Sequence, residues 1–162
     1  PQYPWLYPRD YFTQPTAGQG QVGCLIQNTG VSVGQVLSLY GFVWDPQANG
    51  GLGAVVPMSD IDSFELVTGG SLQNMYVTPQ QLTDKMRSAY GWNDGDDSTV
   101  PDGAFVLDFA LSEDGGYISN ANAINTYLVN GVQLNIKFKS GSVPSSTSTV
   151  YLGVEALKLA TS

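Results

Sequence analysis

The chain has 162 residues, of which 42% are hydrophobic, and this size and composition suit one globular domain with a substantial core. Fourteen acidic residues against six basic ones leave a net charge of −8, and the basic residues are scattered. Direct binding of nucleic acid or of an anionic lipid surface is therefore not expected. The absence of histidine excludes Ser-His-Asp and Cys-His catalysis as well as histidine-ligated metals.

Only 12% of the residues are charged, about half the usual share. A weakly charged surface suits a protein that is covered by copies of itself or by partners. A Gly- and Ser-rich β domain without such partners would have the same composition, so both interpretations remain open. No apolar run approaches the roughly 18 residues of a membrane span, and no signal peptide is visible, so no membrane segment is expected.

Residues 1–20 are predicted to form an extended N-terminal arm, followed by one domain over residues 21–162. The arm is rich in proline, which forbids a regular helix and keeps the chain extended. Its aromatic residues are too dense to be left in water, so the arm either packs on its own domain or crosses to a neighbouring subunit. On the second hypothesis, the residues in contact with the other subunit are Trp5, Tyr7, Tyr11 and Phe12.

The first strand of the domain is predicted over residues 21–28, where Val22, Cys24 and Ile26 alternate with other residues. Cys24 is the only cysteine, which excludes an internal disulfide bond. Its place in the alternation predicts that it is a buried small hydrophobic residue.

Residues 31–44 are apolar on both faces, which is typical of a central strand covered on both sides. Trp44, near the end of this segment, is accordingly expected in the core. Asp45-Pro46 and the following Asn and Gly residues predict a turn. Further short strands are expected at residues 52–56, 61–67 and 72–77.

One helix is predicted after these strands. Thr78 has the character of an N-cap, Pro79 suits the first helical position, and Gln81 completes a Thr-x-x-Gln capping box. Leu82 and Met86 then share one face of the helix. The helix lies in a connection between strands and carries no evident chemistry.

The loop over residues 93–102 is acidic, and its carboxylates are the kind of oxygen ligand that calcium prefers. The spacing does not match an EF-hand, which needs carboxylates at alternate positions and a bidentate Glu at position twelve. Solvated turn residues are the preferred interpretation, and calcium is not expected to be required for folding. No other metal site and no cofactor site is predicted.

Residues 124–159 are predicted to contain two or three adjacent strands on which the rest of the chain packs. Asn130-Gly131 lies between apolar runs and predicts a two-residue hairpin turn, which would set Tyr127 opposite Leu134. Residues 105–111 also alternate and predict a strand that precedes this region.

The last strand is expected over residues 149–159. Leu157 and Leu159 have the opposite parity to the apolar residues before them, so a bulge is predicted near Glu155-Ala156. Alternation in the last two strands predicts a shared core. Its members are Leu134, Ile136, Phe138, Leu152 and Val154.

These elements predict an all-β fold with eight or nine strands and one helix in a long connection. Eight strands in two four-stranded sheets is the arrangement of a single jelly-roll sandwich. A glycosidase would need two converging carboxylates, and nothing places Glu65, Glu113 or Glu155 together. A carbohydrate-binding or adhesion module remains an alternative, with Trp44, Trp92 or exposed tyrosines as sugar platforms.

The chain resembles the small major capsid protein of tailless, membrane-containing icosahedral phages, the sphaerolipovirus-like group. The resemblance lies in the start PQYPWLYPRDYF, the lack of histidine, the low charge, and the closing strands VNGVQLNIKFKS and STVYLGVEALKLA. It implies a single jelly roll located in the capsid shell of a virion. It also implies self-association, for example as a homodimer, a larger capsid protein as a second partner, and an internal viral membrane beneath the shell.

The leading hypothesis is therefore a structural coat protein without catalytic activity. An enzyme that uses carboxylates alone is a third and weaker hypothesis.

Overall fold

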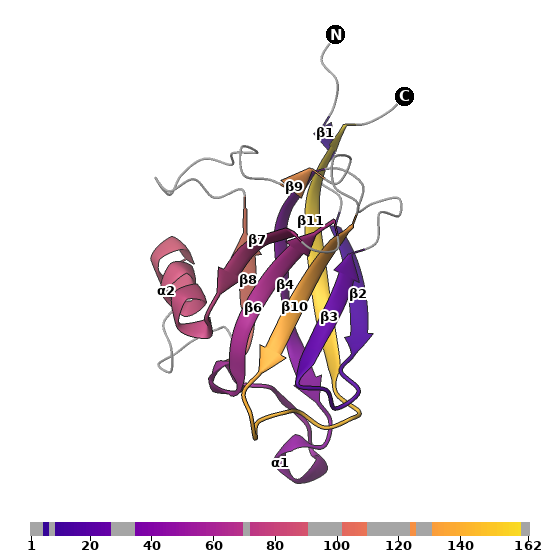
Figure 1. Cartoon of the computed structure of the whole chain (residues 1–162), viewed down its shortest axis with the longest axis vertical. Helices are drawn as coiled ribbons and strands as arrows, with labels where there is room; N and C mark the ends of the chain where they lie inside the picture. Colours follow the sequence, from indigo (N-terminus) through magenta and orange to yellow (C-terminus); the bar gives the residue numbers. More distant parts are fainter. Residues whose placement is uncertain are drawn as a thin grey trace.

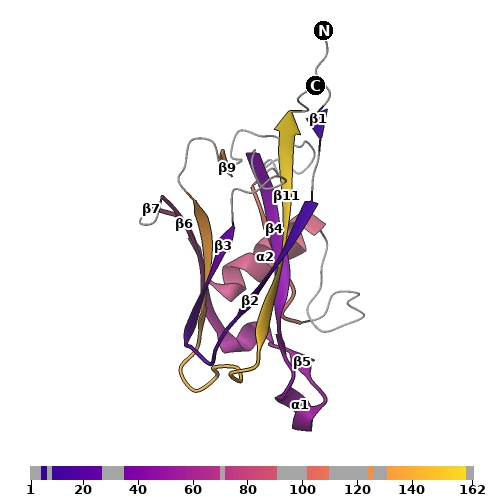
Figure 2. The same ribbon diagram turned by 90° about the vertical axis from the view of Figure 1, so that its right-hand side faces the viewer.

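The computed structural model describes residues 5–6, 9–26, 35–69, 72–90, 102–109, 124–125 and 131–159. It consists of two antiparallel sheets packed face to face, which Figure 2 shows edge-on. The strands are β1 (Trp5–Leu6), β2 (Arg9–Pro15), β3 (Gln21–Ile26), β4 (Gln35–Asp45), β5 (Ala54–Val55), β6 (Ile61–Thr68), β7 (Leu72–Val77), β8 (Phe105–Asp108), β9 (Ile124–Asn125), β10 (Val132–Phe138) and β11 (Thr149–Leu159).

Eight of these strands form a jelly roll, as the sequence predicted. One sheet contains β2, β11, β4 and β8 in this order, and the other contains β3, β10, β6 and β7. Among these eight strands, the chain alternates between the two sheets at almost every connection, and only β6 and β7 follow each other in one sheet. The two-residue strands β1, β5 and β9 extend the first sheet. The fold is therefore an all-β jelly-roll sandwich.

The core fills the space between the two sheets. Alternate residues of β3 and β10 point inward, as in the burial of Val22, Cys24 and Ile26. Phe64 of β6 meets Phe105 of β8 with a ring-centroid distance of 4.9 Å, which joins the two sheets. The five core residues predicted from the last two strands are all buried in one cluster: Leu134, Ile136, Phe138, Leu152 and Val154.

The helix α2 (Pro79–Tyr90) lies beside the sandwich at the edge formed by β7 and β8 (Figure 1). The predicted capping box is present, since the Gln81 N–H donates to Thr78 Oγ1 at 3.3 Å and the Thr78 N–H donates to Gln81 Oε1 at 3.0 Å. Leu82 and Met86 are buried in the core cluster. The helix therefore covers the side of the core that lies open between the edge strands β7 and β8.

The one-turn segment α1 (Ala48–Gly51) lies where the sequence predicted a turn. Asn49 and Gly50 have φ angles of 54° and 68°, so the segment is a tight turn that leads from β4 to β5.

The predicted hairpin at Asn130-Gly131 is wrong in its pairing. Leu134 pairs with Cys24 of β3 on one side and with Leu66 of β6 on the other, so β10 has no edge left for Tyr127. Residues 126–130 themselves lie outside the described residues. The expectation that the last strands are adjacent is also wrong, because β10 and β11 belong to different sheets.

A register shift lies where the bulge was predicted, but its extra residue belongs to the partner strand β4 and not to β11. The register between β11 and β4 shifts between Glu155 and Ala156, whose partners are Ser38 and Val36. The unpaired residue is thus Leu37 of β4, and Ala156 stays buried like Val154.

The N-terminal segment enters the sandwich earlier than the predicted boundary at residue 20. β2 pairs with β11 along its whole length, from Arg9 opposite Glu155 to Pro15 opposite Thr149. β2 is an edge strand, where prolines are tolerated because one side of the strand needs no partner. The first of the eight jelly-roll strands therefore lies within the predicted arm.

Candidate functional site

The outer surface of the β2-β11-β4-β8 sheet carries a group of aromatic side chains. They come from neighbouring strands that the sheet register brings opposite one another. Tyr11 and Tyr40 lie on either side of Gly153, and Tyr151 pairs with Phe42. We refer to this group as the aromatic face, and its members are Tyr11, Tyr40, Phe42, Trp44 and Tyr151.

The parity of the strands explains why these rings face outward. On β4, Leu39 and Val43 are buried in the core, whereas Phe42 is 36% exposed and points the other way. On β11, Val150 and Leu152 are buried, and Tyr151 between them is 41% exposed.

The rings of the aromatic face pack on one another. Phe42 and Tyr151 are stacked with a centroid distance of 5.3 Å, and Tyr11 meets Tyr40 edge-on at 6.4 Å. Gly153 lies beneath the Tyr40 ring, and a Cβ atom at this position would overlap that ring. The small residue thus lets Tyr40 lie flat across the sheet.

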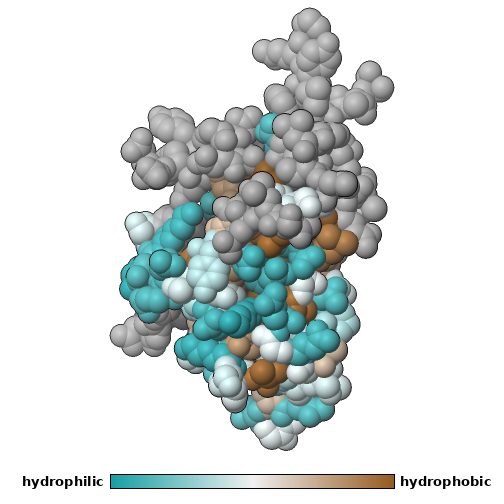
Figure 3. Space-filling view, in the orientation of Figure 1, coloured by the Kyte–Doolittle hydropathy of each residue, from teal (hydrophilic) through white to brown (hydrophobic). Residues whose placement is uncertain are grey.

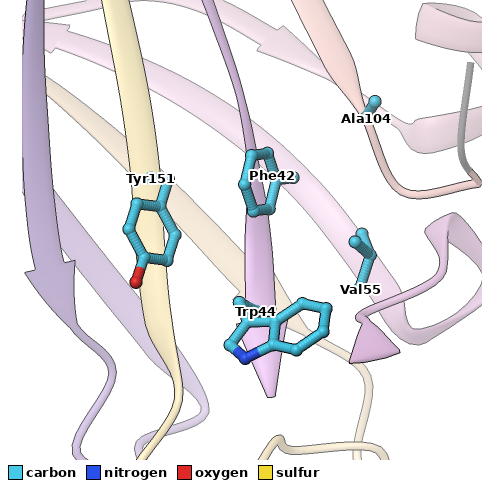
Figure 4. A pocket seen from close by; sticks show the side chains of 5 residues that line it. All are labelled: Phe42, Trp44, Val55, Ala104 and Tyr151. Carbon is cyan, nitrogen blue, oxygen red and sulfur yellow. The ribbon is translucent and has the colours of Figure 1, made fainter. Parts of the chain in front are cut away.

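An open pocket of about 530 Å³ lies within the aromatic face (Figure 4). Its lining has no charged side chain, and only Trp44 and Tyr151 carry a polar side-chain atom. Gly53, with φ of 82°, packs against the Trp44 indole, so any side chain at Gly53 would collide with that ring. The lining residues are Phe42, Trp44, Val55, Ala104 and Tyr151.

Next to this pocket, the loop between β10 and β11 is tied to the end of β4 by Asp45. The carboxylate accepts hydrogen bonds from the Ser145 hydroxyl at 2.5 Å, the Ser145 N–H at 3.1 Å and the Gln47 N–H at 3.0 Å. Burial by itself raises the pKa of Asp45, but these hydrogen bonds, with a contribution from Ser148, bring the pKa below its ordinary value.

The Asp45–Ser145 contact fixes the loop. The Ser145 hydroxyl and N–H both donate to a carboxylate whose lowered pKa keeps it ionised near neutral pH.

The outer surface of the other sheet has the opposite character. Figure 3 shows that the surface over β3, β10 and β6 is largely hydrophilic. On β10, Gln133 donates to Asn135 at 2.6 Å, and Lys137 lies 3.6 Å from the Asp62 carboxylate. Among the described residues, this surface exposes Leu25 and Tyr76 singly, whereas stacked aromatic rings occur on the other side of the sandwich.

The structure separates the four residues predicted to contact another subunit. Tyr11 belongs to the aromatic face and is 71% exposed, whereas Phe12 points inward and packs against the core of its own sandwich. The backbone of Trp5 pairs with Leu159, and Tyr7 lies outside the described residues.

Two predictions about β4 are wrong. The strand is central, but its outer surface is not covered, since Phe42 is exposed and Trp44 is half-buried. Trp44 therefore lines a surface pocket and does not belong to the core. The alternation of Tyr40, Phe42 and Trp44 is a sequence signal that could have identified this face.

The acidic loop lies outside the described residues except for Asp102, which accepts a hydrogen bond from the Met58 N–H at 3.2 Å. Within the described ranges, no three His, Cys, Asp or Glu side chains gather where they could hold a metal ion. The helices described here are too short or too polar to cross a membrane.

Comparison with solved structures shows where this fold occurs. The chain aligns with the major capsid protein P2 from bacteriophage PM2 with a TM-score of 0.59 and 14% identity, over 97% of this chain and 46% of that one. It aligns with the STIV MCP with a TM-score of 0.54 and 15% identity, over 93% of this chain and 48% of that one. The chain thus spans about half the length of each. No protein-family model and no curated sequence matches it.

Proposed function

We propose that this chain is a structural coat protein of a virus, which self-associates and assembles with a second capsid protein into an icosahedral shell in the virion. The observation that carries the proposal is an exposed, uncharged aromatic face on a jelly roll whose solved structural neighbours include two major capsid proteins. A more specific place in the sphaerolipovirus-like group, with an internal membrane beneath the shell, rests on the sequence resemblance.

The aromatic face supports an assembly role because of its composition. Aromatic residues are enriched, and charged residues depleted, at the centre of protein interfaces. A chain that must remain a monomer would not be expected to keep such rings on one sheet while the other sheet is polar. The role proposed here involves no catalysis.

A carbohydrate-binding or adhesion module is the second candidate, because Trp44, Phe42 and Tyr151 could stack against a sugar ring. A sugar site also needs polar groups placed to bind the hydroxyls. The pocket offers the indole N–H and one phenol, so its lining favours an apolar protein segment over a sugar.

Light scattering of the purified chain, with electron microscopy of its concentrated solutions, tests the proposal. We expect self-association that is indifferent to added glycans and reduced by the double substitution Phe42→Ser with Tyr151→Ser. The matched control is Tyr76→Ser, since Tyr76 is a 55% exposed tyrosine on β7 of the other sheet. A monomer that binds a glycan array, and loses that binding in the double variant, would establish the second candidate instead.

A further inference from the structure

Among the described edge strands of the sandwich, β3 (Gln21–Ile26) is the one whose free side lacks protection. We propose that β3 pairs with β3 of a second copy of this chain, antiparallel, through main-chain hydrogen bonds. The inference rests on the proposed coat function and adds a contact to the aromatic face. A single two-fold contact stops at a dimer, so a subunit of a shell needs at least two kinds of contact.

The free side of β3 is open to solvent. β3 is the terminal strand of its sheet, and among the described strands it pairs with β10 alone, from Ile26 opposite Val132 to Gln21 opposite Lys137. Gly23 is exposed although it has no side chain, so main-chain atoms in the middle of the strand reach the surface. The N–H and C=O groups on the free side of an edge strand bind either water or another strand.

The other three edges of the sandwich have features that oppose pairing. β2 contains the charged residues Arg9 and Asp10 and ends at Pro15. β8 has only four residues, and its Val106 N–H donates to the Met86 sulfur of α2 at 3.4 Å. β7 leads directly into α2, which lies beside the edge formed by β7 and β8 (Figure 1). Charge, proline, short length and a covering helix are the usual means by which proteins block a sheet edge.

β3 has none of these features. Its sequence QVGCLI contains no charged residue and no proline. It pairs with β10 over six consecutive residues without a register shift, so the strand is regular from end to end. The buried side chains of Val22, Cys24 and Ile26 hold the backbone extended before any partner arrives, which lowers the cost of pairing. A regular and uncharged edge of this kind is a template for another strand.

A second copy of β3 fits this edge by symmetry. Two identical strands that meet antiparallel are related by a two-fold axis perpendicular to the sheet, so each main-chain contact is made twice. The arrangement keeps the buried residues of both strands inward and places Gln21 and Leu25 of both copies on one outer surface. β3 contributes nothing to the net charge of −8, so the copies meet along an uncharged strand. The two four-stranded sheets become one continuous sheet.

Charged substitutions at the exposed residues of β3 test this contact. Leu25 is 52% exposed and Gln21 is exposed as well, so lysine at both positions should leave the core unchanged. We expect Gln21→Lys with Leu25→Lys to weaken self-association at least about tenfold in analytical ultracentrifugation, because like charges then face one another across the paired strands. The matched control is Tyr76→Lys, which places the same charge at a 55% exposed residue of β7, at the opposite edge of the same sheet.

A mixing experiment separates repulsion from misfolding. Gln21→Glu with Leu25→Glu should also weaken association, whereas an equimolar mixture of the lysine and glutamate variants should restore it, because opposite charges then face one another. A misfolded variant cannot be rescued in this way. Amide hydrogen exchange of the unmodified chain is an independent readout. Exchange in residues 21–26 should slow as the protein concentration rises, while exchange in β7 should stay the same.

Three results would overturn the inference. They are a lysine variant that associates as strongly as the parent chain, a mixture of the two variants that does not associate, and exchange in residues 21–26 that is independent of concentration.

The two proposals fail separately. If the chain associates and only Phe42→Ser with Tyr151→Ser weakens the association, the coat function stands and the β3 contact is wrong. If the β3 variants abolish association and concentrated solutions of the parent chain contain nothing larger than a dimer, β3 pairs as described and the coat function is at fault.

Discussion

At the scale of single residues, two glycines shape the aromatic face. Gly153 of β11 leaves room for the ring of Tyr40, which belongs to the neighbouring strand β4. Gly53 lets the Trp44 indole lie against the backbone of the β4–β5 turn. Any larger residue at either place would push a ring out of position. The face therefore depends on the absence of side chains as much as on the presence of rings.

Cys24 provides a test of the core at this scale. Burial raises the pKa of its thiol to about 12, and the thiolate is the reactive form, so the folded protein should react very slowly with thiol reagents near neutral pH. Denaturant should release one reactive thiol per chain, measured with a chromogenic disulfide reagent. Rapid labelling of the native protein would contradict the burial of Cys24. Self-association should accordingly be insensitive to reducing agents.

Ile136 tests the packing between the sheets. The side chain is fully buried, so Ile136→Ala should lower the free energy of unfolding by about 2–5 kcal/mol, measured by urea denaturation. The neighbouring Lys137→Ala is the control. It removes only a partly exposed ion pair with Asp62, so the expected change is below about 1 kcal/mol. Equal losses in the two variants would argue against the inward orientation of Ile136.

Asp45 gives a pH-dependent test. Its folded pKa lies below the ordinary value of 3.8, so its carboxylate stabilises the folded state above that pH, and the contribution is lost as the pH falls through the folded pKa. Asp45→Asn should therefore be less stable than the parent chain at pH 5–7, and the difference should shrink below about pH 4. Melting curves across this range measure it. A difference that grows toward low pH would contradict the assigned hydrogen bonds.

At the scale of elements, local sequence signals and the observed structure agree closely. The alternation of apolar residues in β3 and β10 matches their inward and outward faces. The capping box sets the start of α2, and the buried residues of this helix close one end of the core. These features depend on neighbours within a few residues, which a sequence displays directly.

The helix start can be tested by substitution. Thr78→Ala removes the hydroxyl that accepts the Gln81 N–H, so it should lower the free energy of unfolding by about 1 kcal/mol. Thr78→Ser keeps the hydroxyl and should retain most of the stability. Chemical denaturation of the three proteins gives the comparison, and an equal loss in both variants would show that the cap is not the cause.

At the scale of the whole molecule, the two outer surfaces of the sandwich differ in kind. One is polar and carries an ion pair, while the other carries stacked aromatic rings around a pocket. The stacked rings are therefore a surface through which the proposed assembly would occur.

Truncation tests where the domain begins. Because β2 pairs with β11 from Arg9 onward, removal of residues 1–8 should leave a folded protein, whereas removal of residues 1–15 should lower the melting temperature strongly. The longer cut deletes an edge strand and the Phe12 ring that packs on the core. Residues 9–15 were assigned to the arm from the sequence, but they pair with β11, so a cut is expected to be tolerated only up to residue 8. Similar melting curves for both truncations would show that β2 is dispensable.

Sequence alone is sufficient to predict the fold class, the alternation of buried residues in the core strands and the start of α2. All of these follow from the spacing of residues along the chain, because a strand turns its side chains to alternate sides and a helix cap lies within one turn. The jelly roll could be inferred from the count of short alternating strands and the position of one helix between them.

The choice of neighbouring strands, in contrast, could not be predicted from the sequence. β10 and β11 follow each other in sequence but lie in opposite sheets, and β10 is flanked by β3 and β6, which excludes the predicted hairpin. The aromatic face depends on the same non-local choice. A strand that is apolar on both sides, such as β4, does not reveal whether its second side is covered, since that depends on segments far away in the chain. Trp44 lines a surface pocket because no described element packs over that side of the sheet.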